Sequence, residues 1–180
     1  MTPLCALLKT YSDWQPSATG GGDHDKTEIL TEAAGLLWNL SEASALALEV
    51  YNRENLSSLL LRVLAATRGA EGARELRLAL LQCLYTATED NPAAAAAVRA
   101  ESGQLEAEIS GEEEGSAKIY GRVLSVGILL NVGQDEQGDD REGFQRKLWP
   151  VAVRTIEQCL KQDQRKMVRR LFDRLNEMCT

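Results

Sequence analysis

The stretch that decides the fold is EAAGLLWNL, residues 32–40. It lies in a segment, about 26–41, whose apolar residues recur at the spacing of an α-helix. They fall in two adjacent stripes: Ile29, Ala33, Leu36, Leu37 and Leu40 in one, Leu30, Ala34 and Trp38 in the other. A helix that is apolar over so much of its girth should be buried by neighbours on more than one side.

Two later segments align with the core of this stretch. LLQCL at 80–84 and ILLNV at 128–132 follow LLWNL at 36–40 by 44 and then 48 residues. This period falls at the armadillo/HEAT value of about 40–47 residues, or one past it. One such unit cannot bury its apolar face alone, so neighbouring units must stack. The sequence therefore predicts an all-α protein, an armadillo/HEAT-type α-solenoid of about three to four stacked repeats. An irregular helical domain is the alternative.

Turn residues and apolar periodicity set the expected boundaries. We expect helices over about 3–13, 26–41, 44–52, 54–67, 74–88, 92–100, 102–110, 117–132, 144–160 and 164–178. They group into one array spanning 1–180, with repeats at about 1–41, 42–89, 92–133 and 143–180 and acidic loops at 111–116 and 134–143.

Charge is distributed unevenly along the 180 residues. The net charge is −7, yet residues 101–143 carry eleven acidic and three basic side chains, and residues 144–180 carry four acidic and nine basic ones. Overall acidity argues against direct nucleic-acid binding, which needs cations against phosphates. The basic tail is more typical of a solvated helix than of a phosphate-binding one. The acidic clusters Glu112–Glu114 and Asp135–Asp140 are likewise more typical of solvated loops than of a surface for basic cargo.

Catalytic, cofactor and metal patterns are missing from the sequence. Cys5, Cys83, Cys159 and Cys179 form no CxxC pair, and His24 is the single histidine. No nucleophile elbow or phosphate loop surrounds the available Ser and Asp residues. We therefore expect a protein that is not an enzyme and needs no cofactor or metal. Free thiols, and the lack of a secretory or membrane-spanning stretch, favour a soluble protein in a reducing compartment, without membrane contact.

The EAAGLLWNL stretch resembles the third helix of an armadillo repeat in importin-α-like and β-catenin-like proteins. In importin-α-like grooves, a Trp and an Asn four residues later bind an extended peptide. Here the Asn position holds Asn39, Cys83 and Asn131, and the Trp position holds Gly35, Ala79 and Gly127. A wall of small residues has no aromatic slots for lysines and would instead accept a bulkier segment or allow tight helix packing. The residues expected on this protein-binding groove are Glu32, Gly35, Asn39, Glu75, Ala79, Cys83, Gly127 and Asn131. Trp38 is interpreted as a core residue, with a binding anchor as the alternative.

A second resemblance covers about residues 1–132. MTPL and ALLK near the start, LWNLSE at 37–42 and TEDNP at 88–92 resemble the symportin family, also called HEAT repeat-containing protein 3. The resemblance implies a chain belonging to a longer protein, and a chaperone-like import adaptor found in cytoplasm and nucleus. It also implies a monomer that escorts basic ribosomal proteins of the 5S ribonucleoprotein. A β-type import receptor would take part in this transport and would bind through regions outside this chain. A general armadillo scaffold or an importin-α-like peptide-binding protein is the alternative.

Overall fold

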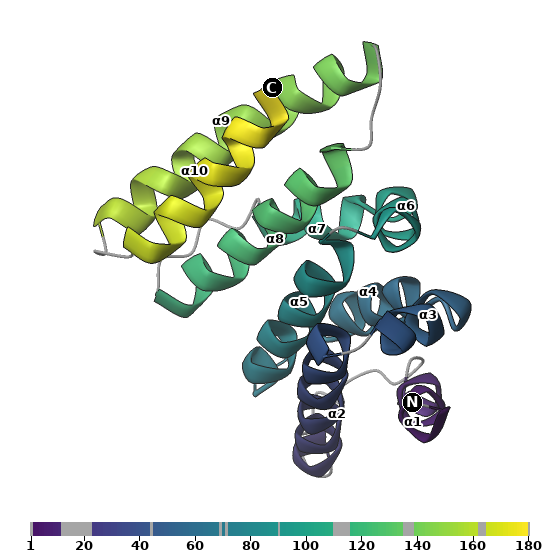
Figure 1. Cartoon of the computed structure of the whole chain (residues 1–180). Coiled ribbons are helices and arrows are strands. Elements are labelled where there is room, and N and C mark those ends of the chain that lie inside the picture. The colour runs from purple at the N-terminus through teal and green to yellow at the C-terminus, as the bar shows by residue number, and fades with distance from the viewer. Residues whose placement is uncertain are drawn as a thin grey trace. The chain divides into compact units, whose positions relative to one another are not determined.

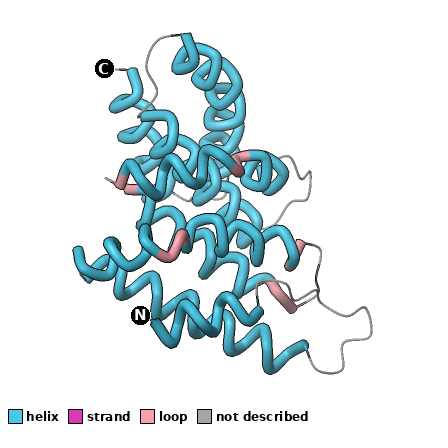
Figure 2. Tube along the Cα trace, turned by 90° about the vertical axis from the view of Figure 1, so that its right-hand side faces the viewer, coloured by secondary structure: helices cyan, strands magenta, loops and turns pink. Residues whose placement is uncertain are grey.

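The computed structural model describes residues 2–11, 23–43, 45–68, 70, 72–89, 91–109, 116–134, 139–161 and 165–179. Throughout these ranges the chain is α-helical or forms short connections between helices, with no strand (Figure 2). The chain forms two compact units, Met1–Ala87 and Thr88–Thr180. The all-α fold predicted from the sequence is confirmed. Each unit is described below by itself.

The first unit is built on leucine-rich helices that pack side against side. It contains α1 (Thr2–Tyr11), α2 (Asp23–Ala43), α3 (Ala45–Arg53), α4 (Leu56–Ala66) and nearly all of α5 (Arg74–Thr88) (Figure 1). Helix α1 packs against α2 and α4, and α3 packs against the same two helices. Their contact surfaces form a core in which the following side chains are fully buried: Leu8, Leu30, Leu37, Tyr51, Leu56, Leu60, Leu64, Leu76, Leu80 and Leu84.

The second unit is organised around its most apolar helix. It contains α6 (Pro92–Ala100), α7 (Gly103–Ile109), α8 (Ser116–Gln134), α9 (Asp139–Lys161) and α10 (Arg165–Cys179). Helices α6, α7, α9 and α10 all pack against α8, and α10 also packs against α9. Every residue from Val123 to Gly133 is buried. A helix that is apolar around its whole circumference needs such cover on several sides.

Polar side chains complete the helix ends in both units. The last four carbonyls of a helix have no partner inside it. Arg77 of α5 donates to the Leu64 carbonyl in the last turn of α4 at 2.6 Å, and Arg99 of α6 donates to the Val132 carbonyl near the end of α8. At the start of α6, Asn91 Oδ1 accepts from the Ala94 amide at 3.3 Å, with Pro92 in the first turn. Asn at the N-cap and Pro in the first turn are both favoured at the N-terminus of a helix.

The observed helix bounds follow the expected ones closely, and α5 and α6 coincide with their predicted ranges. One difference concerns the acidic loop expected at 134–143, because α9 already begins at Asp139. Gly143 is exposed within that helix. A glycine lowers helix stability by only about 1 kcal/mol relative to alanine, so it does not end a helix by itself. Of the loop expected at 111–116, all but Ser116 lies outside the described residues. The division into four repeats stays a prediction.

Candidate protein-binding face

One face of α2 is exposed along most of the helix. The residues on it are Asp25, Glu28, Ile29, Glu32, Leu36 and Asn39, all exposed. Their spacing, i, i+3, i+4, i+7, i+11 and i+14, keeps them on the same side of an α-helix. Two of them are large and apolar: Ile29 is 43% exposed and Leu36 is 53% exposed. We call these six residues the α2 face.

The opposite side of α2 forms part of the core. Leu30, Ala33, Ala34, Leu37 and Ser41 are buried where α1 and α3 pack against this helix. The expectation that α2 is buried on more than one side is therefore wrong. Ile29 and Leu36 belong to the predicted apolar stripe. In the first unit, however, α1 and α3 pack against the adjacent side of α2 and leave these two side chains exposed.

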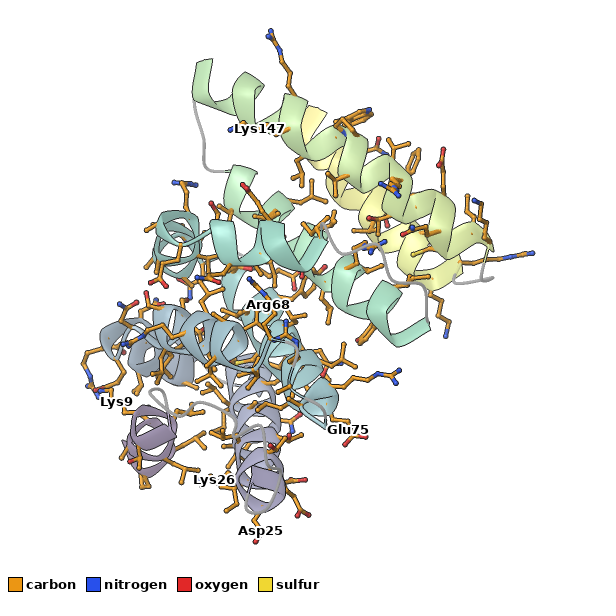
Figure 3. The ribbon with its side chains drawn as sticks, turned by 180° about the vertical axis from the view of Figure 1, so that it is seen from behind. Lys9, Asp25, Lys26, Arg68, Glu75 and Lys147 are labelled. Atoms are coloured by element: carbon orange, nitrogen blue, oxygen red, sulfur yellow. The ribbon has the colours of Figure 1, made fainter. Side chains whose placement is uncertain are left out.

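The α2 face is strongly acidic. Exposed carboxylates lie at Asp25, Glu28 and Glu32, and Glu42 adds a fourth at the edge of the face. Figure 3 shows Asp25 at the N-terminal end of α2, where its side chain points outward from the helix. The sequence of α2 contains only one Lys or Arg, Lys26, and that side chain is half-buried. Such a concentration of one sign of charge attracts a basic partner and speeds its approach.

The edge of this face is open at Gly35. A Cβ placed on Gly35 would meet no heavy atom within 4 Å, so no neighbouring group packs closely there. One turn further on, the half-buried Trp38 donates its indole N–H to Glu42 Oε1 at 3.0 Å. The hydrogen bond holds the carboxylate at the border of the face. Trp38 is half-buried, so it lies partly in the core and partly along the edge of the face.

The other predicted groove residues lie in different environments. On α5, Glu75 is exposed, Ala79 is half-buried and Cys83 is buried. On α8, Gly127 and Asn131 are both buried. Asn131 Nδ2 donates to Thr88 Oγ1 at 3.2 Å within the second unit. Contact of these five residues, and of Glu32, Gly35 and Asn39, with a partner stays a prediction.

The three aligned helices therefore do not present the same surface. Leu36 is exposed, whereas the aligned Leu80 of α5 and Ile128 of α8 are fully buried. Of the eight predicted groove residues, Glu32 and Asn39 are exposed on the α2 face, and the half-buried Gly35 lies at its edge. Sequence reasoning missed Asp25 and Glu28, and it assigned Ile29 and Leu36 to the core. Their signal was present in the sequence, because all four share the helical face of Glu32 and Asn39.

Thiol and metal chemistry find little support in the described residues. Burial raises the pKa of the Cys83 thiol strongly, and burial also raises the pKa values of Cys5 and Cys159. A thiol that stays protonated is a poor nucleophile and a poor metal ligand. Within the described ranges, no three His, Cys, Asp or Glu side chains are grouped so that they could hold a metal ion. In the same ranges no helix is long and apolar enough to span a bilayer.

The packed α-helices of this chain fit an all-α, solenoid-like fold. About half of the chain is similar in sequence to another protein, HEAT repeat-containing protein 3. The Mus musculus protein is 32% identical over 98 residues, which is 51% of this chain and 14% of the relative. The Homo sapiens protein is 33% identical over 99 residues, again 51% and 14%. The resemblance inferred from the sequence is confirmed over this part, and the chain corresponds to a small part of these relatives' length. No family model matches the chain, and no solved structure does.

Proposed function

We propose that the chain is a protein-binding adaptor whose α2 face takes up a basic protein cargo. The observation that carries the proposal is the pairing of two exposed apolar side chains, Ile29 and Leu36, with exposed carboxylates on the same helix face. Apolar anchors bury area on binding, and the carboxylates select a cationic partner. Binding, rather than catalysis, is the role that this face supports.

We further propose that the cargo is a basic ribosomal protein of the 5S ribonucleoprotein. The similarity to HEAT repeat-containing protein 3 and the resemblance to symportin-type adaptors support this choice. The charge of such a cargo complements the acidic α2 face, and neutralising it would keep the cargo from binding other polyanions. In this proposal the chain acts as a monomer in cytoplasm and nucleus, and a β-type import receptor engages the complex. Direct contact with nucleic acid or membrane is not part of it.

A binding titration tests the cargo proposal directly. Purified 5S-associated ribosomal proteins are titrated with the full chain over a series of salt concentrations. The α2 variant Glu28→Lys/Glu32→Lys should weaken binding by on the order of tenfold or more, because it replaces attraction with repulsion. The variant Leu36→Ser should weaken binding with little change in its salt dependence.

The matched control is Glu49→Lys/Glu106→Lys. Both glutamates are exposed on other helices, α3 and α7, and the change in net charge is the same. It should bind cargo nearly as well as the unmodified chain. If both double variants weakened cargo binding equally, the effect would come from the net charge of the chain. That result would overturn the α2 face as the binding site. Absence of binding at low salt would overturn the cargo.

A further inference from the structure

The α2 face has the spacing of a surface that pairs with another helix. Asp25, Ile29, Glu32, Leu36 and Asn39 are all exposed, and they follow one another in steps of four, three, four and three residues. Such steps keep side chains in line along one side of a helix, as the a and d positions of a heptad do. At a rise of 1.5 Å per residue, this line is about 21 Å long.

Apolar and acidic side chains alternate along this line. Ile29 and Leu36 are separated by Glu32, and Asp25 precedes Ile29 by four residues. At about 100° per residue, Glu32 lies about 60° from Ile29 and about 40° from Leu36 around the helix axis, and Asp25 lies about 40° from Ile29. Each apolar side chain is therefore bordered by a carboxylate. A partner that covers Ile29 and Leu36 also comes within reach of negative charge.

The α2 face offers few hydrogen bonds to the backbone of a partner. The backbone groups of a helix are satisfied within the helix, and Asn39 carries the one amide among the six side chains of the face. The aligned positions do not extend this amide into a row, because Cys83 is buried and the buried Asn131 donates to Thr88. The described ranges also contain no strand edge to which an extended peptide could add. An extended peptide would therefore bury backbone groups against apolar side chains without partners, which is costly.

From this geometry we infer that the α2 face binds a basic amphipathic helix of the cargo, which rests on the proposed function and specifies the kind of segment taken up. A helix satisfies its own backbone, so its apolar side chains can cover Ile29 and Leu36 without that cost. Residues seven apart in the bound helix rise by about 10.5 Å, which equals the rise from Ile29 to Leu36. Lys or Arg side chains beside its apolar line lie near Asp25, Glu28 and Glu32. A second copy of α2 does not fit, because two acidic lines repel each other.

Two designed peptides of identical composition test the helical mode of binding in the full chain. The heptad peptide has about three heptads with Leu at a and d and Lys at e and g, so it is amphipathic as a helix. In the alternating peptide the same residues are reordered so that Leu alternates with polar residues, which makes it amphipathic only as an extended strand. Both peptides carry the same fluorescent label and the same net charge.

Fluorescence anisotropy measures the affinity of each peptide for the chain. The heptad peptide should bind at least tenfold more tightly than the alternating peptide, and its binding should weaken as salt rises. In NMR spectra of a ¹³C-labelled heptad peptide, the Cα shifts should be helical in the complex. The shared composition and charge of the two peptides make this difference a measure of conformation alone.

Two variants of the chain place the heptad peptide on the α2 face. Ile29→Ser/Leu36→Ser and Glu28→Lys/Glu32→Lys should each weaken its binding by tenfold or more. All four side chains are exposed, so the thermal unfolding temperature should stay close to that of the unmodified chain.

Each variant has a matched control on other helices. Val153→Ser/Leu160→Ser removes two exposed apolar side chains from α9, and Glu49→Lys/Glu106→Lys makes the same change in net charge on α3 and α7. Both controls should leave binding of the heptad peptide intact.

Other outcomes overturn the inference. One is binding of the alternating peptide as tightly as the heptad peptide, and another is equal weakening by the α2 variants and their controls. A third is a dimer of the unmodified chain in sedimentation that Glu28→Lys/Glu32→Lys dissociates, which would assign the α2 face to a second copy.

Failure of the proposed function is distinguishable from failure of this inference. If the heptad peptide binds the α2 face and the ribosomal proteins do not bind at low salt, the choice of cargo is overturned and the helical mode stands. If Glu28→Lys/Glu32→Lys weakens cargo binding but the alternating peptide binds as tightly as the heptad peptide, the face stands and the helical mode is overturned.

Discussion

Asn131 of α8 donates its side-chain amide to the hydroxyl of Thr88, across 43 positions of sequence and at 3.2 Å. Both side chains are buried, with 4% and 2% of their surface exposed. An asparagine that resembles a peptide-binding residue by its place in the repeat is therefore engaged inside the second unit. A buried amide must be hydrogen-bonded to offset the cost of losing water, and Thr88 supplies one of its partners.

This hydrogen bond should be measurable in the stability of the chain. Asn131→Ala should lower the free energy of unfolding by about 1–3 kcal/mol, because it leaves the buried Thr88 hydroxyl without this donor. Urea denaturation followed by circular dichroism provides the measurement. In a Thr88→Val background the same substitution should cost less, since the partner is already gone. Equal costs in the two backgrounds would show that the pair does not contribute as a pair.

The neighbouring leucines of α2 provide a matched test of which side of the helix is buried. Leu37 is fully buried and Leu36 is 53% exposed. Leu37→Ala should therefore lower the free energy of unfolding by about 2–5 kcal/mol, and Leu36→Ala by less than about 0.5 kcal/mol. Both variants remove the same atoms from the same helix. Similar destabilisation by the two would mean that α2 is covered on both sides.

The pH response of Glu54 should report its ion pair with Lys9. Lys9 Nζ lies 2.7 Å from Glu54 Oε2, and this hydrogen bond, followed by the charge of Lys9, lowers the pKa of Glu54. A depressed pKa in the folded state means that the pair contributes stability above the unfolded pKa of about 4.3 and loses it as the pH falls through the folded value. An NMR titration that follows the Glu54 carboxylate chemical shift provides the measurement. In Lys9→Met the midpoint of this titration should move to higher pH.

A matched substitution on the second neighbour makes this test specific. Arg53 also contacts Glu54, at 3.5 Å, but it contributes less to the lowered pKa. Arg53→Met should therefore shift the Glu54 titration less than Lys9→Met does. A larger shift from Arg53→Met would reverse the assignment of the main partner.

Thiol labelling should distinguish Cys83 from an ordinary cysteine. Its thiol is fully buried in α5, and burial raises its pKa far above the usual range, so the reactive thiolate is scarce. Iodoacetamide at about pH 8 should alkylate Cys83 at least tenfold more slowly in the native chain than in urea. Peptide mass spectrometry resolves the individual cysteines. Alkylation of Cys83 at the denatured rate would contradict the burial of this helix position.

Much of the fold could be predicted because helices are encoded locally. Apolar periodicity located all ten helices among the described residues, and the Asn91–Pro92 pair marked the start of α6 because both residues satisfy local backbone needs. The start of α9 was placed late, because an exposed glycine weakens a helix without ending it. The candidate site was only partly predicted: Glu32 and Asn39 were identified from their place in the repeat, whereas Asp25 and Glu28 were not.

The sequence by itself determined that this chain is all-α, where its helices lie, and that its acidic and basic residues are concentrated in different parts. The tertiary structure alone decided which apolar stripe of each helix is covered. Leu36 and Leu37 are chemically identical neighbours about 100° apart around α2, and only the positions of α1 and α3 make one exposed and the other buried. Burial depends on what packs from elsewhere in the chain, and a local pattern does not contain that information.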